Sequence, residues 1–108
     1  MIKKNDWSTT QRRAMTATEV VTGLAKLEAW VLCGEGATLA IQKSYSFSNY
    51  YQTIAFVNAL AFAAHVSDHH PELMVSYNRC VVRFNTHDVG GISSTDFECA
   101  AAVDALLQ

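Results

Sequence analysis

Hydrophobic residues recur every three or four positions in three stretches of the chain, a period that predicts helices. We expect these helices at residues 17–28, 49–66 and 94–107. Thr16 and Glu19 form a capping-box signal at the start of the first helix, because each side chain can accept a backbone amide hydrogen there. Residues 93–96 give a second capping signal before the last helix.

Between the helices, hydrophobic and polar residues alternate in short segments, which predicts strands. We expect the strands at residues 30–32, 37–45, 73–77 and 80–85, joined in pairs by turns at 34–36 and 78–79. The order αββαββα predicts an α+β domain with a four-stranded antiparallel sheet and three helices packed on one face. We assign residues 16–108 to this single domain and residues 1–15 to a polar N-terminal tail.

The composition fits a folded domain and argues against several function classes. Of the 108 residues, 50% are hydrophobic and 17% are charged, which is enough apolar surface for a core. The net charge of −2 argues against direct nucleic-acid binding. No apolar run approaches the ~20 residues of a membrane-spanning helix. Cys33, Cys80 and Cys99 are too widely spaced for a disulfide framework or a structural zinc site, so we expect reduced thiols and a cytoplasmic protein.

The four histidines, His65, His69, His70 and His87, all lie in the second half of the chain. Pro71 disfavours helical backbone at the residue before it, so the second helix should end ahead of the His69-His70 pair. The hairpin that follows runs out from Pro71 and returns toward His87. Antiparallel pairing should therefore bring His87 beside His69 and His70.

A histidine cluster of this kind has three interpretations. Imidazoles, with an ordinary pKa of about 6.5, can act as general acids and bases at neutral pH. Two or three of them could instead hold zinc together with Glu72 or Asp88, although the spacing lacks the HxH and HExxH patterns of zinc sites. They could also be hydrogen-bonded residues at a helix end. The residues favour acid–base chemistry but leave all three interpretations open.

Several short motifs occur together at fixed intervals. They are His69-His70-Pro71-Glu72, Tyr77-Asn78, Thr86-His87, a glycine pair, and Asp96 at the start of a helix. This set resembles the pterin-4a-carbinolamine dehydratase family over residues 16–107. The resemblance implies dehydration of 4a-hydroxytetrahydropterin to quinonoid dihydropterin, in the recycling of tetrahydrobiopterin for aromatic amino acid hydroxylases, with no cofactor and no metal.

The resemblance also bears on assembly and partners. It implies a homotetramer built as a dimer of dimers, and the broad apolar face of the helix at 49–66 agrees with burial against another subunit. Animal members of the family also serve as dimerisation cofactors of a homeodomain transcription factor. A non-catalytic binding module with a transcription-factor partner is therefore the alternative function.

The resemblance further implies roles for individual residues. His69 and His87 match proton-transfer groups, His70 matches a group that holds the pterin, and Asp96 matches an acid expected to orient His87. With His69, His70 and His87, the predicted pterin-binding set also includes Pro71, Thr86, Asp88 and Val89. The backbone of residues 86–89 could read the edge of the pterin ring.

His65 departs from the family pattern, which usually has a carboxylate four residues before the first histidine of the pair. Residues four apart share one face of a helix, so we expect His65 and His69 to share a face. The alternative is that His65 is a surface residue. Glu72 is expected to be a surface residue at the start of a strand.

Overall fold

The structure of the protein is a computed structural model that describes residues 13–108. Its elements are α1 (Ala17–Ala25), β1 (Val31–Cys33), the 3-10 helix η1 (Gly36–Thr38), β2 (Ala40–Ser46), α2 (Tyr50–Ser67), β3 (Glu72–Ser76), β4 (Arg79–Phe84), the 3-10 helix η2 (His87–Val89) and α3 (Ser94–Ala105). The predicted order αββαββα is confirmed. The first helix ends at Ala25, earlier than predicted. Residues 1–12 of the predicted tail lie outside the described residues.

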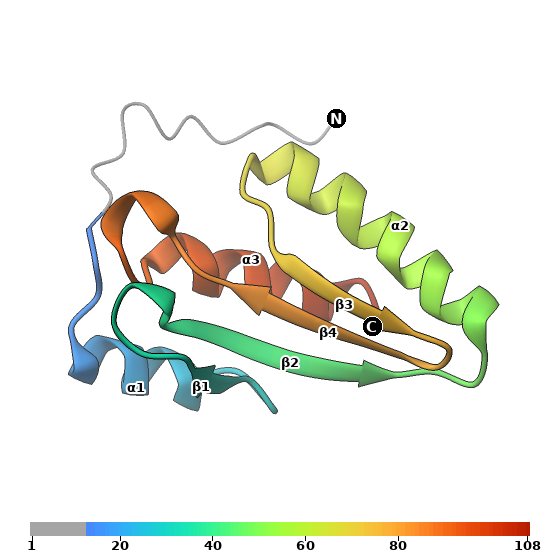
Figure 1. Ribbon diagram of the computed structural model, residues 1–108, viewed down its shortest axis with the longest axis horizontal. Helices are drawn as coiled ribbons and strands as arrows, with labels where there is room; N and C mark the ends of the chain where they lie inside the picture. The colour runs from blue at the N-terminus through green and yellow to red at the C-terminus, as the bar shows by residue number, and fades with distance from the viewer. Residues whose placement is uncertain (1–12) are drawn as a thin grey trace.

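The four strands form one antiparallel sheet in the order β1-β2-β4-β3. Figure 1 shows α3 crossing behind this sheet and α2 running along its β3 side. In the central pair, Ile41 lies opposite Phe84 and Tyr45 lies opposite Cys80. Because side chains alternate along a strand, these four residues point to the same face of the sheet.

The hydrophobic core lies between this face and the three helices, which confirms the predicted α+β architecture. The helices contribute Val20, Phe56, Leu60, Ala64, Cys99, Ala100 and Val103, and the sheet contributes Ile41, Tyr45, Cys80, Val82 and Phe84. On the opposite face, Ser44 and Met74 are exposed. Two of the three cysteines are thus core residues, and Cys33 is partly buried.

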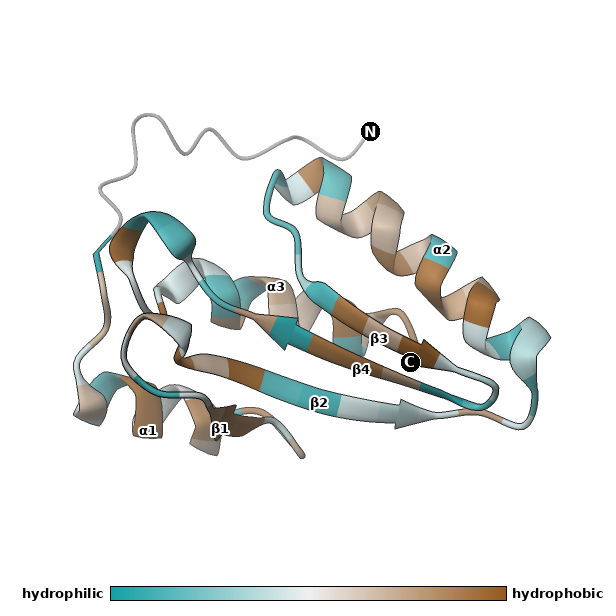
Figure 2. Ribbon diagram, in the orientation of Figure 1, coloured by the Kyte–Doolittle hydropathy of each residue, from teal (hydrophilic) through white to brown (hydrophobic). Residues whose placement is uncertain are grey.

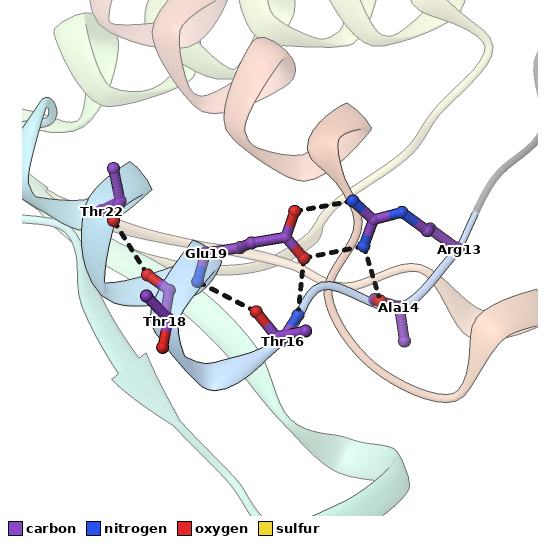
Figure 3. Close-up of polar contacts among 6 residues, drawn as sticks. All are labelled: Arg13, Ala14, Thr16, Thr18, Glu19 and Thr22. Atoms are coloured by element: carbon purple, nitrogen blue, oxygen red, sulfur yellow. Dashed lines mark hydrogen bonds and ion pairs between the residues drawn. The ribbon is translucent and has the colours of Figure 1, made fainter.

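The start of α1 is fixed by the predicted capping box. Glu19 N donates to Thr16 Oγ1 over 3.2 Å, and Thr16 N donates to Glu19 Oε1 over 2.9 Å. Arg13 adds two hydrogen bonds of 2.7 and 2.6 Å to the Glu19 carboxylate (Figure 3). The hydrogen bond from Arg13, followed by that from Thr16, lowers the pKa of Glu19 to about 2. Met15 N donates to Ile92 O, so residues 13–15 attach to the domain.

A polar cluster ties the end of α3 to the sheet. Asp104 accepts hydrogen bonds from Trp30 Nε1 over 3.1 Å, from Lys43 Nζ over 2.9 Å and from Tyr45 Oη. Burial alone would raise the pKa of Asp104, but the hydrogen bonds from Tyr45, Lys43 and Trp30 outweigh it, so this pKa lies below its ordinary value. Burial, followed by the hydrogen bond to Asp104, raises the pKa of Tyr45.

α2 carries hydrophobic residues on several sides (Figure 2). Phe56 and Leu60 face the core, whereas Tyr51 is 83% exposed and Phe62 is 60% exposed. Within residues 13–108, no helix combines the length and the apolar character that crossing a membrane requires.

Candidate active site

The end of α2 directs the histidine pair toward the sheet. Asp68 caps the helix in the left-handed conformation, with φ 54° and ψ 37°. The backbone amides of Asp68 and His69 both donate to Ala64 O, a pattern that closes a helix and reverses the chain. The helix therefore ends before His69, as Pro71 predicts, and the chain passes through His70 and Pro71 into β3.

The hairpin of β3 and β4 brings the third histidine back to this point. Glu72 pairs with Arg83 and Ser76 pairs with Arg79, so the end of β4 lies beside the beginning of β3. His69, His70 and His87 consequently line one cleft of about 280 Å³. The predicted convergence of the three imidazoles is present in the structure.

One wall of the cleft rests on a buried hydrogen-bond network. His69 Nε2 lies 2.6 Å from Asp96 Oδ1. The other carboxylate oxygen, Oδ2, accepts from Thr86 Oγ1 over 2.7 Å and from Ser93 N over 3.0 Å. The hydroxyls of Thr86 and Ser93 lie 2.6 Å apart. The His69 ring also stacks on Phe84, with ring centroids 5.9 Å apart and an angle of 10° between the planes.

This network corrects one prediction. Asp96 was expected to orient His87, but its carboxylate oxygens contact His69, Thr86 and the backbone of Ser93. The physical reason is that His87 lies in the exposed 3-10 helix η2, on the outer side of the loop, whereas Thr86 points inward. Asp96 is therefore the partner of His69.

The remaining predicted site residues occupy different positions. His70, His87 and Asp88 are exposed and line the cleft. Thr86 is fully buried at 0% exposure, so its side chain lies beneath the cleft and not on its wall. Pro71 and Val89 are partly buried and sit next to lining residues in the chain without lining the cleft themselves.

Four further residues line the cleft, and none of them is in the predicted binding set: Asp68, Glu72, Arg83 and Asn85. Arg83 Nη2 donates to Thr38 O over 2.6 Å, and Asn85 Nδ2 donates to Ala37 O over 3.2 Å. These bonds hold the η1 segment at the rim of the cleft. Strand alternation was the available signal, because positions 83, 85 and 87 fall on one side of the extended chain.

His65 is exposed on α2 and does not line the cleft. The left-handed residue Asp68 interrupts the helix between His65 and His69, so the two do not share a helical face. The surface interpretation of His65 is therefore the one that the structure supports. Among residues 13–108, no group of three or more His, Cys, Asp or Glu side chains is placed to hold a metal ion.

Comparison with known proteins gives consistent matches. Residues 13–106 match the family model described as pterin 4 alpha carbinolamine dehydratase. A protein of Paracidovorax citrulli, provisionally named pterin-4-alpha-carbinolamine dehydratase, is 63% identical over 107 residues, covering 99% of this chain and 92% of that protein. A protein of Bdellovibrio bacteriovorus with the same provisional name is 57% identical over 98 residues, covering 87% and 78%.

Two solved structures share the fold. A structure from Brucella melitensis, titled as a transcriptional coactivator/pterin dehydratase, has a TM-score of 0.82 and 28% identity, covering 89% of this chain and 100% of that one. A pterin dehydratase-like protein described as a RuBisCO assembly factor in the alpha-carboxysome has a TM-score of 0.62 and 26% identity, covering 73% and 89%.

Proposed function

This chain belongs to the pterin 4 alpha carbinolamine dehydratase family, and we propose that, as a hydro-lyase, it removes water from a 4a-hydroxytetrahydropterin to give a quinonoid dihydropterin. The observation that carries the proposal is the cleft of about 280 Å³ lined by His69, His70 and His87. Small-molecule sites have volumes of about 300–1,000 Å³, and this cleft lies near the lower end of that range, which suits a small ligand such as a bicyclic ring.

The dehydration needs two proton transfers. The hydroxyl on C4a must be protonated so that it leaves as water, and the proton on N5 must be removed so that the C4a–N5 double bond forms. Imidazoles can carry out both steps at neutral pH without a redox change. Three imidazoles line the cleft, so it can supply one group for each transfer.

The environments of the histidines support distinct roles. His69 is buried at 8% exposure and is braced by Asp96, an arrangement that orients an imidazole as a general base. We assign it the removal of the N5 proton. His87 is exposed, so solvent can reach its ring, and we assign it the protonation of the departing hydroxyl. His70, also exposed at the rim, holds the pterin ring.

Steady-state measurement of carbinolamine dehydration against the buffer-catalysed rate tests this proposal. We expect the protein to accelerate the reaction and His69→Ala and His87→Ala to lose about 100-fold or more in kcat, the usual contribution of a general acid or base. His65→Ala is the matched control, because His65 is exposed and lies outside the cleft. A wild-type rate equal to that of buffer would overturn the proposed activity.

A binding function is the second candidate, because one structural relative is titled a transcriptional coactivator and another is described as an assembly factor. The exposed aromatic residues Tyr51 and Phe62 on α2 support an association surface. Whichever of the two functions holds, we propose that this surface joins subunits in a homotetramer. Size-exclusion chromatography with light scattering tests it: Phe62→Ser should dissociate the assembly, and a wild-type monomer would refute it.

The biological setting rests on family membership. We propose that the protein acts in the cytoplasm, in the recycling of the tetrahydropterin that aromatic amino acid hydroxylases oxidise. The His87→Ala variant separates catalysis from binding in cells that lack the wild-type protein. If the cell needs only the enzyme activity, the variant should fail to restore the phenotype. If the cell needs a binding module, the variant should restore it.

A further inference from the structure

We infer that Thr86 and Ser93 are positioning residues whose paired hydroxyls fix Asp96 as a hydrogen-bond acceptor and thereby hold His69 in one tautomer. This inference rests on the proposed function, because it concerns the histidine assigned as base. It also reassigns Thr86, which the sequence places in the pterin-binding set and the structure places beneath the cleft.

The direction of each hydrogen bond follows from counting protons. Asp96 Oδ2 receives the backbone N–H of Ser93 and the hydroxyl of Thr86. A hydroxyl has one proton, so Thr86 has none left for Ser93. The 2.6 Å contact between the two hydroxyls must then be a donation from Ser93 Oγ to Thr86 Oγ1. The chain of donors runs from Ser93 through Thr86 to Asp96.

The same count assigns the proton between His69 and Asp96. Two donors at Oδ2 favour the ionised form of Asp96. An ionised carboxylate only accepts, so His69 Nε2 is the donor to Oδ1 across 2.6 Å. The ring nitrogen left for exchange with substrate is Nδ1. Stacking on Phe84 keeps the ring in this orientation.

Burial makes the arrangement sensitive to a single hydroxyl. Thr86 and Asp96 are 0% exposed and Ser93 is 2% exposed, so water cannot replace a lost donor. Without the Thr86 hydroxyl, Oδ2 loses one of its two donors and the carboxylate attracts the Nε2 proton more strongly. When Nδ1 takes up a proton from solvent, the Nε2 proton can then move to Asp96, which leaves a protonated Asp96 beside the Nδ1–H tautomer of His69. In that state Nδ1 already carries a proton and cannot accept the one from the substrate.

Thr86→Val tests the inference, because valine keeps the shape of threonine and removes the hydroxyl. Thr53→Val is the matched control: Thr53 is also 0% exposed and its hydroxyl also has two hydrogen-bond partners, Asn49 O and Tyr77 O, at the opposite end of α2. Thr86→Ser is the conservative variant, because serine keeps the hydroxyl and lacks only the methyl group. We expect Thr86→Val to lower kcat about 10- to 100-fold with little change in KM, and the other two variants to keep the wild-type kcat.

Nitrogen-15 NMR of the histidine side chains gives a readout that does not depend on activity. Wild-type protein should show His69 protonated at Nε2, and Thr86→Val should show an increased share of the Nδ1–H tautomer. The inference is overturned if His69 keeps its tautomer and kcat in Thr86→Val, or if Thr53→Val changes them equally. If wild-type protein lacks dehydratase activity but the tautomer shifts in Thr86→Val, the proposed function fails while the hydrogen-bond network stands.

Discussion

Asp104→Asn is expected to destabilise the fold at neutral pH, by an amount that depends on pH. Asp104 joins the end of α3 to the sheet by accepting hydrogen bonds from Trp30, Lys43 and Tyr45. The side chains of Lys43 and Asp104 are only 18% and 19% exposed, so this pair is largely shielded from solvent. An asparagine can keep one acceptor oxygen but loses the charge and leaves at least one donor without its partner.

The magnitude follows from these contacts. A hydrogen bond to a charged group contributes about 1.5–3 kcal/mol, and an unsatisfied buried donor costs about 1–3 kcal/mol. Because the asparagine oxygen retains part of the cluster and the donors are only partly buried, we expect a loss of about 2–3 kcal/mol in the free energy of unfolding at pH 7. Urea unfolding at a fixed protein concentration measures it.

The pH dependence of this loss has a definite sign. Hydrogen bonds hold the pKa of Asp104 below its ordinary value in the folded state. The stability that the carboxylate supplies is therefore fully present above the unfolded value, about 3.9, and is lost as the pH falls through the lower folded value. The difference between wild type and Asp104→Asn should stay constant from pH 7 to pH 5 and shrink below about pH 4. A difference below about 0.5 kcal/mol at pH 7, or one that stays constant down to pH 3, would refute this account of the cluster.

Three further substitutions and one control substitution test the backbone and the site. Gly34→Ala should destabilise by about 2–4 kcal/mol in urea unfolding, because Gly34 has φ +79° and an added Cβ would lie 2.3 Å from Thr38 O; a loss under about 1 kcal/mol would contradict this. Ala29→Gly should stabilise the fold by about 0.5–1 kcal/mol, because Ala29 has φ 64°, which glycine adopts more easily than alanine. The control Ala55→Gly, within α2, should instead destabilise by about 1 kcal/mol. Equal effects of the two substitutions would show that the φ of Ala29 does not decide the result. His70→Ala should raise KM more than it lowers kcat, and the reverse result would place His70 among the proton-transfer groups.

The repeating patterns of the sequence predict the elements and the convergence of the histidines well. Both depend on local periods and on hairpin pairing, which act over short distances in the chain. The end of α1 is different, because Leu27 keeps the helical period of hydrophobic residues although the helix stops at Ala25. The backbone then passes through Ala29 at φ 64° to bring Trp30 into the core. Long-range packing thus sets the end of α1, whereas the local hydrophobic pattern alone predicts a longer helix.

The contacts of Asp104 show a second limit. Trp30, Lys43 and Tyr45 are separated from Asp104 by dozens of residues, and no local period marks them as its partners. Their meeting depends on where the end of α3 crosses the sheet, which requires the packed structure. The rim of the cleft is similar, because Arg83 meets Thr38 only when β2 and β4 pair.

The partner of Asp96, by contrast, was within reach of the sequence pattern. Phe84 is a core residue at the end of β4, and alternation continued two residues further places Thr86 on the same inner side and His87 on the outer side. The backbone stays extended that far, because Thr86 bridges to Gly91 and its N–H donates to Gly91 O over 2.8 Å. The buried carboxylate of Asp96, at the start of α3, therefore hydrogen-bonds to the inward-facing Thr86. It also hydrogen-bonds to His69, which the end of α2 directs to the same place. The family motif suggested His87 as the partner of Asp96. The alternation of side chains along the strand instead places Thr86, and not His87, on the side of Asp96.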